Sequence, residues 1–495
     1  MPIDLQQRKK GLSLSLARSE GTVPFCGALH RRDLFSWGLR GLGATALLHL
    51  LGRDGVVHAD EPRPLPARAK RVVQITLIGG LSHLDSFDYK PELRRSHGRS
   101  LSMTEPPDIF FGQVGLLRGA DWAFRRRGQS GLWVSDLFPH IAGIADDITV
   151  VRSMVADTAN HTPGLFTLNT GFAANGFPSL GSWLSYGLGA ETDELPAYVV
   201  LPDGRGEPNG GASNWTSAFL PAEHQGVPFR SGPEAVRDLF PARAIPAAEE
   251  AATRGFLARL NEAHLERAGG ESALAARVRS YALAARMQRA VPRVADLGDE
   301  PESVRALYGL DRPECADAAR RCLLARRLLE RGVRFVQVYS GGPIAGSPRV
   351  SWDAHENVRD NHGAEAVRID RPVAALVRDL ARRGMLDDTL VLFTTEFGRT
   401  PFTQSAAGTV GTGRDHNRYG FSCWLAGAGV KRGFAFGATD EVGWKAVEDP
   451  VPWHDFHATV LHLLGIDHER LTFYHNGIRR RLTNVHGQVL HAILG

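Results

Sequence analysis

Residues 390–401 constrain the fold of this chain more than any other stretch. They read LVLFTTEFGRTP, an apolar run that ends in two threonines, a single carboxylate at Glu396 and a turn-forming glycine at Gly398. An apolar run bounded by glycine is typical of a strand buried in an α/β sheet. Such sheets bind their ligands in a crevice at the carboxyl ends of the strands. We therefore expect Glu396 to stand in a ligand-binding crevice.

Two other apolar runs end close to a Gly-Gly pair. Residues 71–78 (RVVQITLI) stop at one pair, and residues 334–339 (RFVQVY) come shortly before another. Polar side chains follow the three runs: Ser82, His83, Asp85 and Asp88, then Asp353, His355 and His362, and finally Glu396, Arg399, Asp415 and His416. We expect these groups to meet at one edge of the sheet. For the first group the alternative is a helix cap with a solvated His83.

The rest of the chain alternates between strand and helix patterns. Short apolar runs at 148–152, 197–201 and 421–426 predict strands, and amphipathic patterns at 364–382 and 451–464 predict helices. This order predicts an α/β fold with a mainly parallel central sheet and helices on both faces. Residues 60–495 are expected to form a single domain, with loop and helical insertions at about 202–332.

The sequence Asn160-His161-Thr162-Pro163 precedes a helical pattern. Proline suits the first turn of a helix, so we expect His161 and Thr162 at the N-terminus of that helix. Free backbone N–H groups at such a position favour an anion. The alternative is an ordinary capped helix.

The first 59 residues have the pattern of an export signal. Arg31 and Arg32 precede a mildly apolar stretch at 37–51, and residues 57–59 (VHA) offer an A-x-A-like cleavage site. This pattern predicts a twin-arginine signal, passage through the twin-arginine export machinery and a periplasmic or secreted mature protein. The alternative is a basic amphipathic helix.

Charge, hydrophobicity and cysteine spacing argue against nucleic-acid binding, a membrane span and a disulfide between Cys315 and Cys322. The chain has a formal charge of +4, but the predicted signal holds eight Lys/Arg and four Asp/Glu, so the mature chain is neutral. A neutral chain gives no case for a nucleic-acid partner. No stretch reaches the roughly 18 consecutive apolar residues of a membrane span. Cys315 and Cys322 lie seven apart on one predicted helix, too far for a disulfide.

Imidazoles and carboxylates that converge from several strand ends favour a divalent-metal site. We expect Zn²⁺, Mn²⁺, Ca²⁺ or a similar ion, since His nitrogens and Asp/Glu oxygens are metal ligands. Such an ion could polarise an oxyanion and lower the pKa of bound water. Each residue alone is weak evidence, so the prediction depends on their shared position after strands.

Several longer motifs resemble a known family. They are RRDLF, GGLSHLDSFDYKP, NHTPGLFTLNTG, WDAH, GMLDDTLVLFTTEFGRTP, GRDHNRYGFSCWLAGAGVKRG, GATDEVGWKAVEDPV and HDFHATVLHLLGIDHERLT. Together they cover nearly the whole mature chain and resemble the family called domain of unknown function 1501. The resemblance implies an exported bacterial protein with a fold similar to the alkaline phosphatase and sulfatase superfamily. The family name itself states that no activity is established.

The superfamily resemblance implies roles for individual residues. Sulfatases and nucleotide phosphodiesterases place a Cys, Ser or Thr nucleophile nine residues before a Thr-Gly pair, and that position here is His161. The implied roles are catalytic for His161, Thr162 and Glu396; metal-binding for Asp353, His355 or His362, His416, Asp85 and Glu396; and supporting for His83, Arg399 and Asp415. Gly79-Gly80 and Phe397 occupy positions where the superfamily has further ligands. One centre, made by Asp353, His355 and His416, is therefore better supported than a second.

The differences between this chain and the superfamily pattern leave two main hypotheses for its function and a weaker third. The first is a metal-dependent hydrolase of phosphate or sulfate esters, acting on a small-molecule or glycan ester, with His161 or Thr162 at the attacking or oxyanion position. The second is an exported binding or cell-surface assembly protein that keeps the fold but has lost the nucleophile. A Ser-His-Asp hydrolase that uses Ser82 is weaker, because the chain has no G-x-S-x-G motif.

Overall fold

The computed structural model describes residues 65–102, 107–232, 234–241, 243, 245–268, 272–344 and 349–495. The predicted export signal, its cleavage site and Cys26 lie outside the described residues. In the described part, Cys315, Cys322 and Cys423 are buried free thiols. No helix there is long and apolar enough to cross a membrane.

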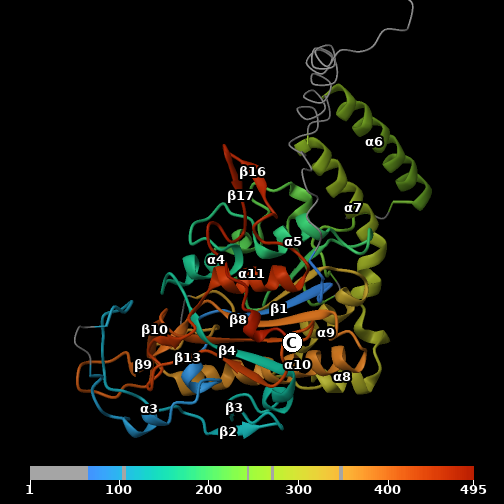
Figure 1. The fold of residues 1–495 in the computed structure, drawn as a ribbon. Helices are drawn as coiled ribbons and strands as arrows, with labels where there is room; N and C mark the ends of the chain where they lie inside the picture. The colour runs from blue at the N-terminus through green and yellow to red at the C-terminus, as the bar shows by residue number, and fades with distance from the viewer. Residues whose placement is uncertain are drawn as a thin grey trace, which may run out of the picture. The chain divides into compact units, whose positions relative to one another are not determined.

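A central sheet of nine strands organises the described chain (Figure 1). Its strands are β1 (Arg71–Leu77), β4 (Ile148–Val155), β5 (Tyr198–Leu201), β6 (Val227–Pro228), β7 (Phe335–Ser340), β8 (Thr389–Thr395), β11 (Phe421–Ala426), β12 (Phe434–Phe436) and β15 (Val451–Pro452). The order is β12-β4-β11-β8-β1-β7-β5-β6, with β15 beside β4. Central β1 pairs in parallel with β7 and β8. Within this sheet, β11 runs antiparallel to β4 and β8. The predicted mainly parallel sheet is confirmed.

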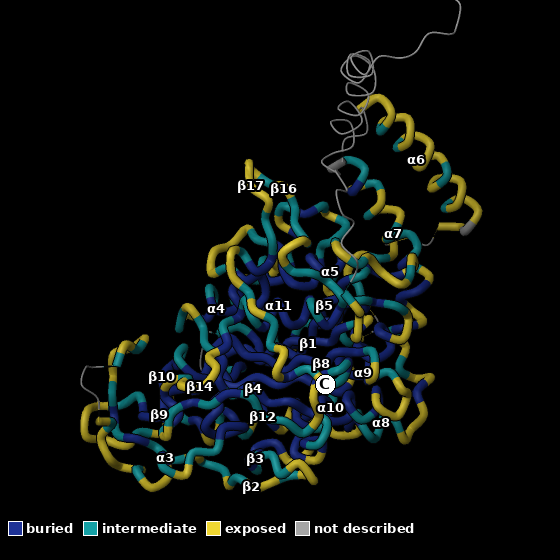
Figure 2. Tube along the Cα trace, viewed as in Figure 1, coloured by how far each residue is buried: buried dark blue, intermediate teal, exposed yellow. Residues whose placement is uncertain are grey.

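Helices cover both faces of this sheet, as predicted (Figure 1). Alternate side chains of β1 and β8 point to opposite faces, because the side-chain period of a strand is two residues. Val73 and Val391 pack in a core with α9 (Ala316–Glu330) and α10 (Val358–Arg382). Val72 and Leu390 pack in a second core with α4 (His161–Thr170), α5 (Leu180–Leu188) and α11 (Trp453–Leu463). Burial on both faces explains why these strands are mostly apolar (Figure 2).

Further elements lie outside the central sheet. The remaining helices are α3 (Pro91–Arg95), α6 (Ala247–Arg267), α7 (Ser272–Ala295) and α8 (Glu302–Tyr308). The remaining strands form four antiparallel pairs: β2 (Phe124–Arg127) with β3 (Leu132–Ser135), β9 (Gly398–Thr403) with β10 (Arg414–Asn417), β13 (Ala438–Thr439) with β14 (Ala446–Glu448), and β16 (Phe473–His475) with β17 (Ile478–Arg480). Sequence analysis did not predict β9 and β10, which carry charged residues yet are fully buried. They matter because they follow Glu396 directly and bring His416 back toward it.

One prediction concerns acid stability and His457 on α11. Burial lowers the pKa of His457 to about 3, and Nε2 lies 2.8 Å from the Leu168 carbonyl oxygen. The unfolded chain binds a proton here below about pH 6.5, whereas the folded chain stays neutral until about pH 3, so the folded state loses stability as pH falls between these values. His457→Gln keeps an N–H donor but does not titrate. We expect the slope of unfolding free energy against pH to decrease by about 1 kcal/mol per pH unit.

The measurement is urea unfolding of both proteins at pH 4, 5 and 6. Equal slopes in the two proteins would contradict a neutral, buried His457.

Candidate metal centre

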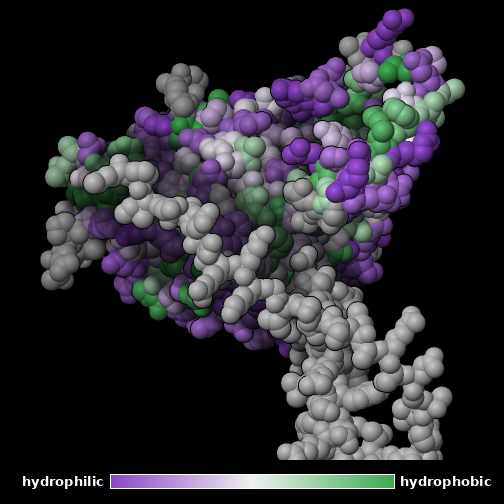
Figure 3. Space-filling model, turned by 90° about the horizontal axis from the view of Figure 1, so that it is seen from above, coloured by the Kyte–Doolittle hydropathy of each residue, from purple (hydrophilic) through white to green (hydrophobic). Residues whose placement is uncertain are grey.

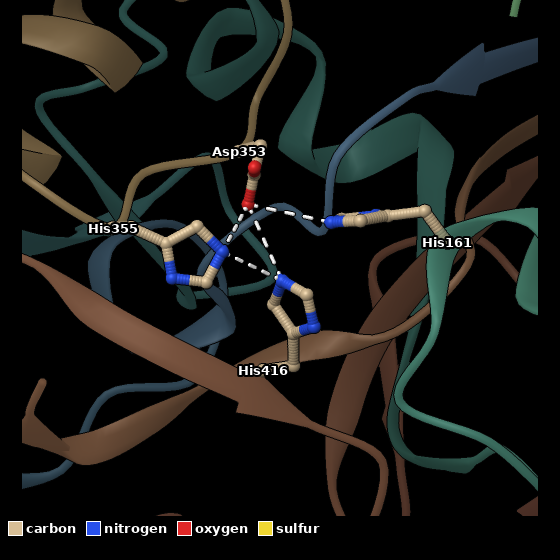
Figure 4. Close-up of side chains that lie close together, drawn as sticks. All are labelled: His161, Asp353, His355 and His416. Carbon is tan, nitrogen blue, oxygen red and sulfur yellow. Dashed lines mark hydrogen bonds and ion pairs between the residues drawn. The ribbon is translucent and has the colours of Figure 1, made fainter. Parts of the chain in front are cut away.

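Four buried side chains converge at the carboxyl edge of the sheet: His161, Asp353, His355 and His416 (Figure 4). One donor atom from each lies within 4.8 Å of the donor atoms of the other three. His161 is the first residue of α4, Asp353 and His355 lie in the loop after β7, and His416 is on β10. Figure 4 shows the three rings and the carboxylate pointing toward one another from different parts of the chain.

Local backbone structure sets the position of each side chain. The Asn160 side chain caps α4 by accepting a 3.3 Å hydrogen bond from Thr162 N, so His161 begins the helix. The end of β1 approaches the Asp353 loop closely, because a Cβ on Gly79 would lie 2.4 Å from Asp353 N. Gly79 also has φ +116°, which side-chain-bearing residues rarely adopt. Glycine at this position therefore permits the close approach of the Asp353 loop to the sheet.

Each imidazole of the cluster has an oxygen acceptor at Nδ1. Nδ1 of His161 lies 2.7 Å from Glu396 Oε1, and Nδ1 of His416 lies 2.6 Å from the Ala159 carbonyl oxygen. Nδ1 of His355 contacts Gln404 Oε1. A carbonyl or carboxylate oxygen accepts a hydrogen bond, so these partners favour the neutral tautomer that carries its proton at Nδ1 and keeps a lone pair at Nε2. Such partners fix the tautomer of metal-binding histidines.

The three Nε2 atoms face one another and one carboxylate oxygen. Nε2 of His355 lies 2.9 Å from Nε2 of His416, and Asp353 Oδ1 lies 2.7 Å from Nε2 of His355. Nε2 of His161 and of His416 are each 3.3 Å from the same oxygen. Tetrahedral ligands bound to Zn²⁺ at about 2.0–2.1 Å lie about 3.3–3.4 Å apart. The two 3.3 Å separations agree with this spacing, and the 2.7 and 2.9 Å separations are shorter. Lone pairs that face each other at 2.9 Å need a cation or proton between them.

Two arginines contact the carboxylate of Asp353. Nη2 of the buried Arg399 lies 2.6 Å from Oδ1, and Arg349 Nη1 contacts Oδ2. Burial would raise the pKa of Asp353, but Arg399 and the three histidines hold that pKa well below its usual range. These contacts therefore hold Asp353 in its ionised form.

The imidazoles differ in their electrostatic surroundings. Burial lowers the pKa of His416 well below its usual range, although Asp353 opposes this shift. Burial also lowers the pKa of His161, but hydrogen bonds to Asp353 and Glu396 outweigh it and leave the pKa raised. The two pKa shifts therefore have opposite directions: the surroundings of His416 favour the neutral form that binds a metal, and those of His161 favour the protonated form.

The model of the family described as "Protein of unknown function (DUF1501)" matches residues 69–494. The chain belongs to this family. The match confirms the resemblance that the motifs indicated. No curated protein matches the chain.

Several solved structures align with this DUF1501 protein. A lipoteichoic acid synthase from Listeria monocytogenes, LtaP, is 10% identical and aligns over 82% of this chain and 75% of its own, with TM-score 0.35. The PsFucS1 sulfatase from Pseudoalteromonas sp. is 12% identical over 89% of this chain and 73% of its own, with TM-score 0.34. An alkaline phosphatase superfamily protein from Vibrio parahaemolyticus is 10% identical over 86% and 76%, with TM-score 0.34.

Glu396 of the DUF1501 protein lies beside the cluster, next to Nδ1 of His161. Its side chain is fully buried, and its Oε1 accepts hydrogen bonds from Gly79 N at 2.8 Å and from His161 Nδ1. It therefore contacts the nitrogen of His161 that points away from the other three cluster residues. Glu396, expected to be catalytic and a metal ligand, lies outside the four-residue cluster and contacts it through His161 Nδ1 at 2.7 Å. Phe397 packs against the rings of His161 and His416, with centroid distances of 4.8 and 4.6 Å.

The structure does not bring Asp85 or His83 to the cluster. Asp85 is paired with Arg414 at 3.1 Å and accepts hydrogen bonds from Ser82 Oγ at 2.6 Å and Asp121 N at 2.8 Å. His83 Nε2 lies 2.9 Å from the Gly443 carbonyl oxygen. Asp85, which the resemblance implied as a ligand, therefore lies outside the cluster, and its oxygens bind other groups.

His362 also lies outside the cluster, so His355 is the histidine that joins Asp353. Burial lowers the pKa of His362 to about 3, and its Nε2 accepts a 2.9 Å hydrogen bond from Ser82 N. The ring thus contacts the main chain of Ser82, while Ser82 Oγ bonds Asp85. This arrangement is not a Ser-His-Asp triad.

The remaining predicted residues surround the cluster. Asp415 accepts hydrogen bonds from His416 N at 2.7 Å and from Phe111 N at 3.0 Å, which places it in a supporting position. Arg399 supports Asp353, and its Nε donates to the Gly80 carbonyl oxygen at 2.9 Å. Thr162 is partly buried in the first turn of α4, and its backbone N–H is used by the Asn160 cap.

Sequence reasoning missed four residues near the cluster: Gln404, Arg349, Phe110 and Phe111. The ring of Phe110 is 5.2 Å from that of His416, and the ring of Phe111 is 4.8 Å from that of His355. Both phenylalanines are about half exposed, at 46% and 52%. The polar segment that holds Phe110 and Phe111 therefore forms part of the wall of the site. The adjacent aromatic pair in this polar segment was the available signal.

Proposed function

We propose that this DUF1501 protein is an exported metal-dependent hydrolase of phosphate or sulfate esters. The observation that carries the proposal is the convergence of three imidazole Nε2 atoms on Asp353 Oδ1, with each Nδ1 held by an oxygen acceptor. A cluster that only stabilised the fold would not need three lone pairs directed at one point. The substrate is proposed to be a small-molecule or glycan ester.

The donor set fits a divalent transition metal. Three nitrogen donors and one carboxylate oxygen suit Zn²⁺ or Mn²⁺ better than Ca²⁺, which prefers six to eight oxygen ligands. His161, Asp353, His355 and His416 would hold the ion. When bound, it supplies Lewis-acid chemistry that polarises an ester oxygen and lowers the pKa of a water molecule.

The surrounding residues favour an anionic substrate. Arg349 and Arg399 offset the negative charge of Asp353, so the charge of an added cation remains available to a phosphate or sulfate group. The side chain of Arg349 is 26% exposed, which lets its guanidinium reach a ligand from solvent. The N-terminus of α4 begins at His161 and adds a partial positive charge.

The test is to measure metal content and ester turnover on the same preparation. We expect purified protein loaded with Zn²⁺ or Mn²⁺ to retain about one ion per chain and to hydrolyse p-nitrophenyl phosphate or p-nitrophenyl sulfate. The matched control is His140→Ala, since His140 is an exposed imidazole that does not belong to the cluster. A protein that retains no metal and turns over neither ester would overturn the proposal.

One observation favours a second candidate function, an exported binding or cell-surface assembly protein. The position of the superfamily nucleophile is the buried ring of His161, whose nitrogens both face carboxylates. A chain that retains the metal but leaves both esters intact, and that captures envelope proteins or glycans, would support this function over hydrolysis.

The export part of the proposal depends on the twin-arginine pattern at Arg31 and Arg32. We propose a periplasmic or secreted mature protein that the twin-arginine machinery delivers. Replacing both arginines with lysine should leave the precursor in the cytoplasmic fraction. Unchanged delivery of the variant would contradict this route.

A further inference from the structure

Helix α6 exposes a stripe of side chains with two large apolar residues at its centre. The stripe consists of positions that alternate in steps of four and three residues: Glu249, Thr253, Phe256, Leu260, Ala263 and Arg267. Such spacing places residues on one face of a helix, and all six are exposed. Phe256 and Leu260 are 55% and 47% exposed, and Leu257 at the edge of the stripe is 49% exposed. Figure 2 shows α6 as exposed along almost its entire length.

The opposite face of α6 is the one that contacts the rest of the described chain. Arg254 Nη1 lies 3.3 Å from Gln288 Oε1 on α7, and Asn261 and Leu265 are partly buried. The stripe therefore does not serve the packing of α6 on α7. Figure 3 shows green, apolar residues among purple ones on the helices at the right of that view, where α6 and α7 lie. Exposed apolar side chains that lie close together on one helix, as Phe256, Leu257 and Leu260 do, favour an interaction site there.

The ends of the stripe carry opposite charges. Glu249 is in the first turn of α6 and Arg267 is in the last. Among the described residues, Glu249 has no ion-pair partner, and Arg267 Nε donates only to the Ala263 carbonyl oxygen of its own helix, at 3.1 Å. The two charges lie about 27 Å apart along the axis, too far to meet within one helix.

We propose that α6 pairs antiparallel with α6 of a second copy of this chain. A two-fold axis level with Ala258 places Phe256 opposite Leu260 and Glu249 opposite Arg267 of the other copy. Each apolar residue then contacts an apolar residue of the other copy, and each charged residue contacts one of opposite charge. A two-fold dimer requires such a self-complementary contact. A parallel pair would bring Glu249 to Glu249 and Arg267 to Arg267. A membrane surface would instead favour basic residues at both ends of the stripe.

The length of the stripe determines how strongly the proposed dimer is expected to associate. α6 has 21 residues, or three heptads, which is short for a coiled coil. We therefore expect a reversible dimer with a dissociation constant of about 1–100 μM, as for interfaces at the small end of the range. Sedimentation velocity of the full chain between about 1 and 200 μM covers this range.

Charge reversal tests the antiparallel register. Glu249→Arg and Arg267→Glu should each weaken the dimer about tenfold, because each replaces two attractive pairs with two repulsive ones. The double variant should restore dimerisation. Glu262→Arg, an exposed change outside the stripe, is the matched control and should have no effect. A chain that is monomeric at 200 μM, or a double variant as weak as the single ones, would overturn the proposal.

Cysteine crosslinking tests the same register independently. Thr253 and Ala263 of opposite copies occupy one layer, so the double variant Thr253→Cys/Ala263→Cys should form an intermolecular disulfide on mild oxidation. Neither single variant should do so, because position 253 faces position 263 and not itself. Equal crosslinking of a single variant would reject the antiparallel pair in favour of a different contact between copies.

Discussion

Replacing His416 with alanine is expected to remove the metal from the protein. Nε2 of His416 lies 2.9 Å from Nε2 of His355 and 3.3 Å from Asp353 Oδ1, so it is one of four donors to a single point. Burial keeps the imidazole neutral, which is the form that binds metal. Alanine supplies no donor, and the buried ring leaves a space that water can enter. We expect metal affinity to fall at least a hundredfold, more than for loss of a group that only orients a ligand.

The measurement is competition with a chromogenic chelator at pH 7.5, followed by elemental analysis after dialysis. His140→Ala should keep the affinity of the wild-type protein. If His416→Ala retains its metal while unfolding at the wild-type temperature, the four residues do not form the site.

Glu396→Gln is expected to weaken metal binding about tenfold while leaving the fold intact. Oε1 of Glu396 accepts both the Gly79 N–H and the His161 Nδ1–H, and a glutamine Oε1 can do the same. The substitution therefore removes the negative charge but keeps the geometry. Loss of this charge makes His161 a poorer donor, and groups that orient metal ligands typically contribute 10- to 100-fold to affinity.

The raised pKa of His161 determines how Glu396→Gln changes the release of protons on metal binding. Burial lowers that pKa, and the hydrogen bonds and charges of Asp353 and Glu396 outweigh it. In Glu396→Gln the pKa should fall, so less proton is released when metal binds near neutral pH. Isothermal titration calorimetry in two buffers of different ionisation enthalpy measures this release. If Glu396 served only in packing, its replacement would not change the number of protons released when metal binds.

Glu396→Ala is the comparison that separates charge from structure. Alanine leaves the Gly79 N–H and the His161 Nδ1–H buried without an acceptor, at a cost of about 1–3 kcal/mol for each. We expect this variant to lose both stability and metal. If Glu396→Gln binds metal and releases protons as the wild-type protein does, Glu396 does not act through His161.

Much of the fold could be predicted because its signals are local. The apolar runs that became β1 and β8 are continuous in sequence, and burial on both faces of a parallel sheet requires that continuity. The start of α4 was equally local, since Asn160 and Pro163 determine where the helix begins. By contrast, β9 and β10 have no apolar run, so their buried charged residues gave no strand signal.

The site was predicted in part, and the missing part depended on contacts between distant segments. His161, Asp353 and His416 follow strands or begin helices, so their position at one edge of the sheet was predictable. The choice between His355 and His362 was not, because it depends on α10 starting at Val358 and directing His362 toward Ser82. The contact of Phe111 with Asp415 joins residues about 300 positions apart, and no local pattern reports it.

The sequence by itself determined the alternation of strands and helices, the family and the residue types at the crevice. These features follow from hydrophobic periodicity and short motifs. Only the tertiary structure decided what Glu396 does. The residue follows β8 as predicted, but its carboxylate reaches the Nδ1 side of His161 and the backbone of Gly79. A side chain adopts the direction in which its buried oxygens find donors, and those donors belong to segments more than 200 residues away. Sequence spacing holds no information about that direction.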